Sequence, residues 1–320
     1  MRARPRAGLY FLASVALICG PIHAQQESAS STASLVHDSK ERSIRLKNHE
    51  PTFLGYTKDS DDEAFMDFTI SLQHPVLPEL LNEGNNRLKL LPYFAVTARF
   101  GQYIGTRDSS PVVTKRFNPK LFLRHAPKGF PERGESPDSY IDFEYAHESN
   151  GQQVNSLSTF QTTTQALGGN QEHAKDYISR GWDYLGVTTK IPISSWNAHL
   201  YVSRKWYCGC RLQKDIEENF DFEDPREIRS IRQVSGWRAL LRFDPKNEFV
   251  DRTVLIADTG TRDTFKYNTA RLEVGIRPMS RLFGVPFMIW GQNGYLSDLA
   301  QYYKKVHSFG AAFVFETFGR

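Results

Sequence analysis

The sequence predicts an all-β protein: a closed barrel of twelve antiparallel transmembrane strands of the outer-membrane type. Three observations predict it. Apolar and polar residues alternate in about a dozen runs of roughly 10 residues, the length that lets a tilted strand cross a bilayer. Aromatic residues, which favour strands, make up 13% of the chain. Charges such as Asp142 and Glu144 occupy the polar faces of these runs. A barrel lumen pairs such charges, whereas a packed β-sandwich core excludes them.

The composition argues against two classes of protein, nucleic-acid binders and helical membrane proteins. Of the formal charge of +4, three units come from Arg2, Arg4 and Arg6, which lie in a predicted leader. The remaining balance of +1 argues against a nucleic-acid partner, because such binding depends on excess positive charge. A mean hydropathy of −0.49 is too low for a protein with repeated apolar helices of about 20 residues.

The N-terminal region predicts export. An arginine-bearing start, an apolar stretch at residues 8–20 and the small residue Ala24 indicate a signal peptide over residues 1–24. A short anchor helix is the alternative. Residues 25–50 are Ser-rich and charged without periodicity, which predicts a flexible segment before a barrel domain over residues 51–320. An exported location also permits a disulfide between Cys208 and Cys210.

The strand signals follow one another along the barrel domain. In residues 64–73 every even position is apolar, and residues 90–102 repeat this pattern. The last runs cover residues 265–278 and 306–318. The predicted strands lie near residues 51, 63, 91, 116, 138, 179, 196, 234, 251, 265, 284 and 307. Aromatic residues near strand ends are typical of interfacial girdles, and we assign Tyr103, Trp182, Trp206, Tyr207 and Trp290 to this role.

The segment at residues 140–152 carries the candidate chemistry. Strand parity places His147 and Ser149 on the same side as the apolar residues Ile141, Phe143 and Tyr145. If that side faces outward, a polar pair stands at the end of the outer wall, where the accessible substrate is lipid. A histidine on the same face can take the proton that makes a serine hydroxyl nucleophilic.

A third residue is needed to fix the tautomer of the histidine. Parity in the following strand places Asp183 on its outward face, and antiparallel pairing would bring it beside His147. A His–Ser pair with a structural role is an equally good interpretation of these residues alone. No Gly-x-Ser-x-Gly motif surrounds a serine, so the α/β-hydrolase arrangement is absent from the sequence.

A resemblance makes this interpretation more specific. Residues 147–151, His-Glu-Ser-Asn-Gly, resemble the His-Asp-Ser-Asn-Gly motif of the outer membrane phospholipase A family. Residues 179–183, Ser-Arg-Gly-Trp-Asp, resemble that family's Ser-Arg-Ser-Trp-Asn. Further similar segments lie at residues 117–123, 205–207 and 294–299, so the resemblance extends from about residue 51 to the end. The family fold is a barrel of twelve strands.

The resemblance implies a function and roles. The family hydrolyses acyl esters of phospholipids and lysophospholipids in the bacterial outer membrane, with the site toward the external leaflet, and is active as a calcium-bound homodimer. Ser149 would be the nucleophile, His147 the general base, and Asp183 the orienting residue, where the family has Asn. The backbone N–H groups of Ser149 and Gly151 would form the oxyanion hole. The calcium ligands would be the Gln152 carbonyl, the Ser179 hydroxyl and, from the second subunit, the Ser109 carbonyl.

Two departures from the family pattern bear on this site. Val154 stands where the family often has an acidic residue, which lowers the expected calcium affinity. Between Gly151 and Ser179 lie 27 residues where the family has a few. This insertion predicts a long external loop, either a tolerated surface insertion or a lid, and it leaves Asn155 as a second candidate for the orienting role. The rival functions are a non-enzymatic barrel, either a pore or a surface-binding protein, and a soluble β-sandwich hydrolase.

Overall fold

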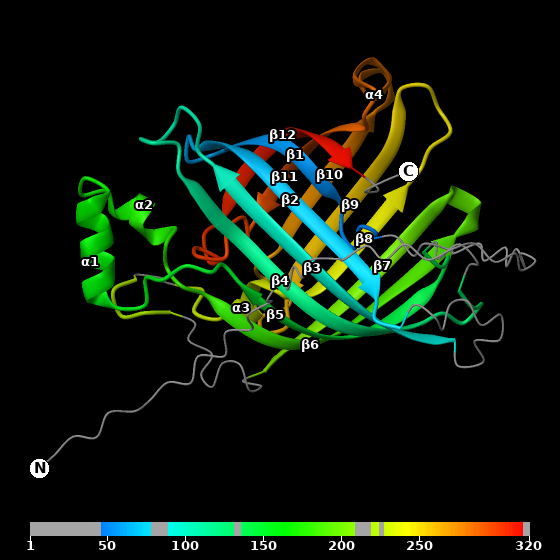
Figure 1. The fold of residues 1–320 in the computed structure, drawn as a ribbon, viewed down its shortest axis with the longest axis horizontal. Coiled ribbons are helices and arrows are strands. Elements are labelled where there is room, and N and C mark those ends of the chain that lie inside the picture. Colours follow the sequence, from blue (N-terminus) through cyan, green and yellow to red (C-terminus); the bar gives the residue numbers. More distant parts are fainter. Residues whose placement is uncertain (1–45, 78–88, 131–135, 209–218, 224–226, 316–320) are drawn as a thin grey trace, which may run out of the picture. The chain divides into compact units, whose positions relative to one another are not determined.

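The chain forms a closed antiparallel β-barrel. The computed structural model describes residues 46–77, 89–130, 136–208, 219–223 and 227–315. Within these residues twelve strands each pair with their neighbours in sequence, and β1 pairs with β12 to close the sheet (Figure 1). The predicted fold class is therefore confirmed. The predicted signal peptide at residues 1–24 and residue Cys210 lie outside the described residues.

Every predicted run corresponds to one strand. The strands are β1 Thr52–Asp59, β2 Ala64–Pro75, β3 Leu90–Gln102, β4 Val112–His125, β5 Tyr140–Ser149, β6 Gly181–Ile193, β7 Ala198–Cys208, β8 Gly236–Phe243, β9 Val250–Gly260, β10 Thr269–Ile276, β11 Phe287–Gly294 and β12 Val306–Phe315. Short helices lie in the connections between strands: α1 Leu157–Ala166, α2 Gln171–Lys175, η2 Ser194–Trp196, α3 Ile231–Val234 and α4 Arg277–Phe283. None of the helices in this part of the chain is long and apolar enough to cross a bilayer.

Alternating burial along the strands separates an outer wall from a charged lumen. On β3, for example, Phe94 is exposed while Tyr93 and Ala95 are buried. On β4 and β5, inward-facing charges are paired across the two strands. Arg124 bonds to Asp142 on β5 at 2.7 Å by two hydrogen bonds. Pairing of this kind is what makes a charged interior compatible with a folded barrel.

The interpretation of the aromatic residues as a girdle is wrong for four of the five. Tyr103, Trp182, Tyr207 and Trp290 are buried, each more than nine-tenths, within the apolar clusters. Only Trp206 of the five is exposed. Strand parity explains the difference, because proximity to a strand end says nothing about which face a side chain occupies.

The run at residues 265–278 is shorter than predicted. Strand β10 ends at Ile276, and Arg277 begins helix α4, where Pro278 occupies the first turn. Proline is tolerated there because the first helical N–H groups have no intrahelical partner. Helix α4 lies at the opposite end of the barrel from α1 and α2 (Figure 1). We call the end with α1 and α2 the site rim; its described residues are 60–63, 103–111, 150–180, 219–223, 227–235, 261–268 and 295–305.

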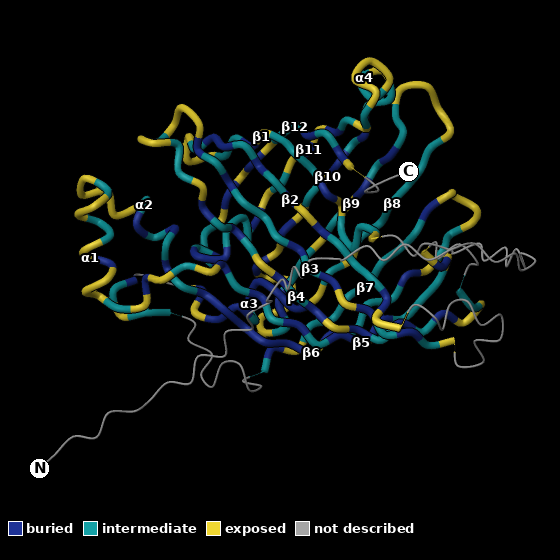
Figure 2. Tube along the Cα trace, viewed as in Figure 1, coloured by how far each residue is buried: buried dark blue, intermediate teal, exposed yellow. Residues whose placement is uncertain are grey.

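The insertion between β5 and β6 contains α1 and α2 rather than an irregular loop. Ser156 and Thr159 form a reciprocal capping box at the start of α1, and the Asn170 side chain caps α2. Most of the α1 surface is exposed (Figure 2). The insertion is held by a buried apolar cluster of Val154, Phe160, Ala174, Ile178 and Ala300, with Phe220 and Phe222 packed against it.

Ion pairs tie this insertion to other loops of the site rim. Arg107 contacts Asp176 at 2.7 Å and Glu63 at 3.1 Å. His173 contacts the same Glu63 at 3.1 Å. Burial raises the pKa of Asp176, but the charges of Lys115 and Arg107 outweigh it and hold the pKa below its usual range. The insertion is therefore anchored to the connections between β1 and β2 and between β3 and β4.

The last residues before β1 contact the barrel lumen. His49 lies 5.3 Å from Phe122, ring centre to ring centre, and Glu50 lies 3.6 Å from Arg116. The rest of the segment predicted to be flexible, up to residue 45, lies outside the described residues. At the end of β7, Cys208 is disulfide-bonded.

Candidate active site

Strands β5 and β6 bring the candidate catalytic residues together. They pair antiparallel with His147 opposite Asp183 and Ser149 opposite Gly181. Along β5, Phe143 is exposed while Asp142 and Glu144 are buried, so the odd positions face outward. His147 and Ser149 therefore stand on the outer wall at the site rim.

The imidazole of His147 is oriented by a buried carboxylate. Its Nδ1 lies 2.8 Å from Oδ1 of Asp183. The Asp183 side chain is fully buried, while that of His147 is 27% exposed. A carboxylate only accepts hydrogen bonds, so Nδ1 carries the proton and Nε2 is the basic nitrogen. Asn155, the other candidate for the orienting role, is exposed to solvent, and the structure brings Asp183 to the imidazole in its place.

Ser149 is the last residue of β5 and lies two positions from His147 on the same face. It is half-buried and pairs with Phe117 of β4 as well as with Gly181. Among the described residues no hydrogen bond joins its hydroxyl to the imidazole. Catalytic hydrogen bonds of this type commonly tighten only when substrate binds. The two side chains share one strand face, and Gly181 places no side chain opposite the hydroxyl.

The lumen side of β5 fixes its position. Glu148, between the two candidate residues, contacts Arg116 at 2.8 Å and Lys205 at 2.7 Å. Asn118 on β4 donates to the backbone carbonyl of His147 at 2.9 Å. Asn118 lies in a segment quoted for the family resemblance, but strand alternation alone gives no sign of this contact.

Beyond Ser149 the chain turns sharply at Gly151, whose φ of 62° favours glycine. The returning segment lies alongside it. Val154 and Ile178 form a parallel bridge, and the Ser179 N–H donates to the Val154 carbonyl at 2.8 Å. Gln152 and Ser179, two of the three candidate calcium ligands, are thereby brought to neighbouring segments.

The third candidate ligand, Ser109, lies on a different loop, between β3 and β4. It adopts a left-handed φ of 62°. Two residues earlier on that loop, Arg107 contacts Asp176 in the insertion. The loop is therefore connected to the segment before Ser179, and the assignment of Ser109 to a second subunit remains a prediction.

The donor chemistry fits calcium better than a transition metal. No cluster of three His, Cys, Asp or Glu side chains suited to a metal occurs in the described residues. The Gln152 carbonyl and the Ser179 hydroxyl are neutral oxygen donors, which hard cations accept. Val154, where a carboxylate would strengthen the site, is instead fully buried in the apolar cluster under α1. A cation held here would therefore bind weakly.

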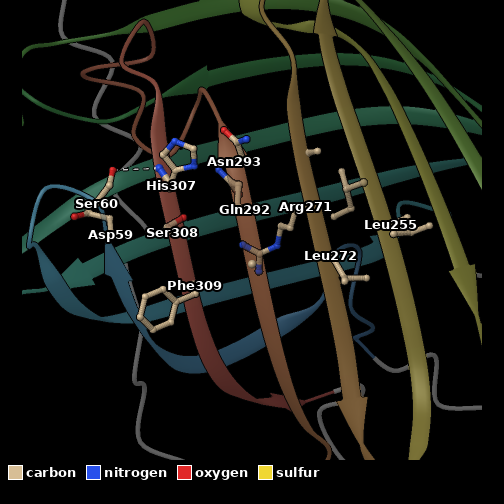
Figure 3. Close-up of a pocket in the computed structure, with 13 residues that line it drawn as sticks. Asp59, Ser60, Leu255, Arg271, Leu272, Gln292, Asn293, His307, Ser308 and Phe309 are labelled. Atoms are coloured by element: carbon tan, nitrogen blue, oxygen red, sulfur yellow. Dashed lines mark hydrogen bonds between the residues drawn. The ribbon is translucent and has the colours of Figure 1, made fainter.

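A separate hollow lies on the wall formed by β9 to β12 (Figure 3). Its volume is ≈ 520 Å³. The exposed Leu255, Leu272 and Phe309 line it, and Asn293 and His307 lie at its site-rim end. None of the candidate catalytic residues belongs to it, so the candidate site is a surface of the outer wall on β5 and β6.

Comparison with known proteins gives a likeness in structure but none in sequence. No protein-family model matches the chain, and no curated sequence matches it. Outer membrane phospholipase A from Escherichia coli is 17% identical with a TM-score of 0.57, covering 86% of this chain and 99% of that one. An active-site mutant of the Escherichia coli enzyme is 17% identical with a TM-score of 0.58, covering 88% of this chain and 95% of that one.

The dimeric outer membrane phospholipase of Salmonella typhi, with bound calcium, is 16% identical with a TM-score of 0.59, covering 87% of this chain and 95% of that chain. At this level of identity these likenesses establish the fold. The chain has the barrel fold of outer membrane phospholipase A.

Proposed function

We propose that this protein is an outer-membrane phospholipase that hydrolyses acyl esters of phospholipids and lysophospholipids. The observation that carries the proposal is the bond between His147 and the buried Asp183, on the outer wall of a barrel and on the same strand face as Ser149. A barrel that served only as a pore or as a binding surface has no need for an oriented imidazole beside a serine.

The proposed reaction is acyl transfer through Ser149. Nε2 of His147 takes the hydroxyl proton while Oγ attacks the ester carbonyl, and Asp183 stabilises the imidazolium that forms. The N–H groups of Ser149 and Gly151 stabilise the oxyanion. The intermediate collapses as His147 passes its proton to the departing glycerol oxygen, which releases the lysolipid. Water, activated by His147, then hydrolyses the acyl-enzyme.

Calcium is the proposed cofactor, held by the Gln152 carbonyl, the Ser179 hydroxyl and the Ser109 carbonyl of a second copy of the chain. When bound, it would supply positive charge that stabilises the developing oxyanion. In support, the bridge between Val154 and Ile178 holds side by side the two segments that carry Gln152 and Ser179. We propose that the active form is the homodimer, with its sites toward the external leaflet.

Membrane lipid reaches such a site by lateral movement. The outer wall below His147 is apolar, with the exposed Phe143, Leu185 and Leu121 on adjacent strands. An acyl chain in the bilayer can lie along this wall while its ester lies at the height of Ser149. The predicted signal peptide at residues 1–24 supports export to this location.

Ester hydrolysis by the purified, refolded protein tests the proposal. Fatty acid released from phospholipid in mixed micelles is measured with calcium, with excess chelator, and after calcium is restored. We expect activity that chelator stops reversibly, and none from Ser149→Ala. Undiminished hydrolysis in chelator would refute the calcium site but not the triad. A folded protein that releases no fatty acid under any of these conditions would favour the non-enzymatic barrel.

A further inference from the structure

Asn150, directly after Ser149, joins the two segments of the candidate site through its side chain. It is fully buried. Its Nδ2 donates to the Ile178 carbonyl at 2.7 Å, and its Oδ1 accepts from the Arg180 N–H at 2.9 Å and from the Gln152 N–H at 3.4 Å. The Asn150 backbone N–H also donates to the Arg180 carbonyl at 3.1 Å.

These bonds enclose Ser179. Ile178 and Arg180 flank it, so one carboxamide holds the peptide groups on both sides of this residue. The same carboxamide bonds the Gln152 N–H, one residue beyond Gly151. An amide side chain offers two donors on one arm and an acceptor on the other, so it can bond two separate backbone groups at once. The contact therefore connects the nucleophile, the turn at Gly151 and the Ser179 hydroxyl.

We propose that Asn150 is a positioning residue that sets the oxyanion N–H groups and the calcium donors relative to Ser149. This inference rests on the proposed function. The physical reason is that the turn at Gly151 leaves the regular sheet, where no ladder of backbone bonds fixes it. Displacement of reacting groups by about 1 Å can lower a rate by about 100-fold.

The neighbourhood predicts that variants of Asn150 still fold. Arg180 is also held from the other side, by an ion pair with Glu223 and a 3.3 Å hydrogen bond to the Ala300 carbonyl. The bridge between Val154 and Ile178 does not involve the Asn150 side chain. Loss of the carboxamide should loosen the site without releasing the segment.

The test compares the full-length wild type with Asn150→Ala, Asn150→Asp and the control Gln233→Ala. Asn150→Asp keeps the shape and the acceptor but removes the donor to Ile178. Gln233 is also a buried carboxamide bonded to backbone groups of the site rim, the N–H groups of Arg229 and Ser230. Folding is checked for each by the heat-dependent shift in gel migration.

Three readouts are measured: fatty acid release against calcium concentration, Tb³⁺ binding by luminescence, and the labelling rate of Ser149 by a fluorophosphonate in chelator. For Asn150→Ala we expect kcat to fall about 100-fold, with at least tenfold more calcium or Tb³⁺ required and slower labelling. Asn150→Asp should show the same losses to a smaller degree, and Gln233→Ala none of them.

A role in stability alone would lower the unfolding temperature of Asn150→Ala and leave all three readouts unchanged. Values within threefold of wild type in both Asn150 variants would overturn the inference. If the wild type itself neither releases fatty acid nor reacts with the fluorophosphonate, the proposed function fails, and the positioning role fails with it.

Discussion

The two faces of strand β5 present charge in opposite ways. Toward the lumen, Asp142, Glu144 and Glu148 are each paired with a cation of a neighbouring strand. Toward the outside, the apolar wall ends in His147 and Ser149. These three carboxylates on the lumen side are each neutralised by a cation, whereas the outward pair leaves a basic nitrogen and a hydroxyl accessible. The lumen face of this strand thus stabilises the barrel, and its outer face carries the candidate catalytic residues.

Residues adjacent in sequence on this strand have different roles. Glu148 lies between the two candidate catalytic residues, but its carboxylate serves Arg116 and Lys205 on the lumen side. Proximity in a motif does not assign a role, because successive side chains of a strand point to opposite faces. The comparison therefore predicts that outward substitutions change the rate, and inward substitutions change the stability.

The largest effect should come from the outward pair itself. We expect Ser149→Ala and His147→Ala each to lower phospholipid hydrolysis by about 1,000-fold or more, because each removes a reacting group. The heat-dependent gel shift should stay at the wild-type temperature. Wild-type hydrolysis by Ser149→Ala would disprove the assignment of the nucleophile.

Asp183→Ala should cost less than either change. It removes the orientation of the imidazole and the charge that stabilises its protonated form, but leaves both reacting groups in place. We expect the loss in kcat to be about 10- to 100-fold smaller than for Ser149→Ala or His147→Ala, since the orienting member of such a triad commonly costs less than the nucleophile or the base. Rates equal to wild type would assign the third role to Asn155 or to solvent.

Self-association should affect the outward face of the barrel and not the lumen. A site on an outer wall has no second wall of its own, and two barrels packed by this face would form two equivalent grooves. Activity per mole should therefore rise, by about tenfold, as the protein-to-detergent ratio increases and crosslinking shows dimers; bound calcium should favour the dimer by linkage. Constant activity across that transition would mean that each barrel carries a complete site.

The smallest effect on activity should come from the inward face. Glu148→Gln leaves Arg116 and Lys205 without their shared carboxylate, which we expect to lower the free energy of unfolding by about 3 kcal/mol. Hydrolysis by the folded protein at low temperature should stay within a few-fold of wild type. If Glu148→Gln lost activity as completely as Ser149→Ala, the separation of roles between the two faces would be wrong.

Much of the fold and the placement of the candidate site followed from alternation. Period-two patterning located every strand, and parity in two segments was enough to bring Asp183 beside His147. Nearness to a strand end does not indicate a face, and Trp182 and Trp290, which the girdle interpretation places outward, are buried. The contact between Asn150 and the backbone around Ser179 had no local signal, because it forms only after the 27-residue insertion has folded back.

The connection between β11 and β12 bears on when the candidate site is complete. Ala300, between β11 and β12, packs in the same buried cluster as Val154 and Ile178, and its carbonyl accepts from Arg180. The segment before β6 therefore lacks part of its support until the final hairpin is in place. In a nascent or half-inserted chain the candidate nucleophile Ser149 would lie beside a segment without this support, so the proposed site would be complete only once the barrel closes. Under the proposed function, lipid would meet an active site only after the protein has been fully assembled.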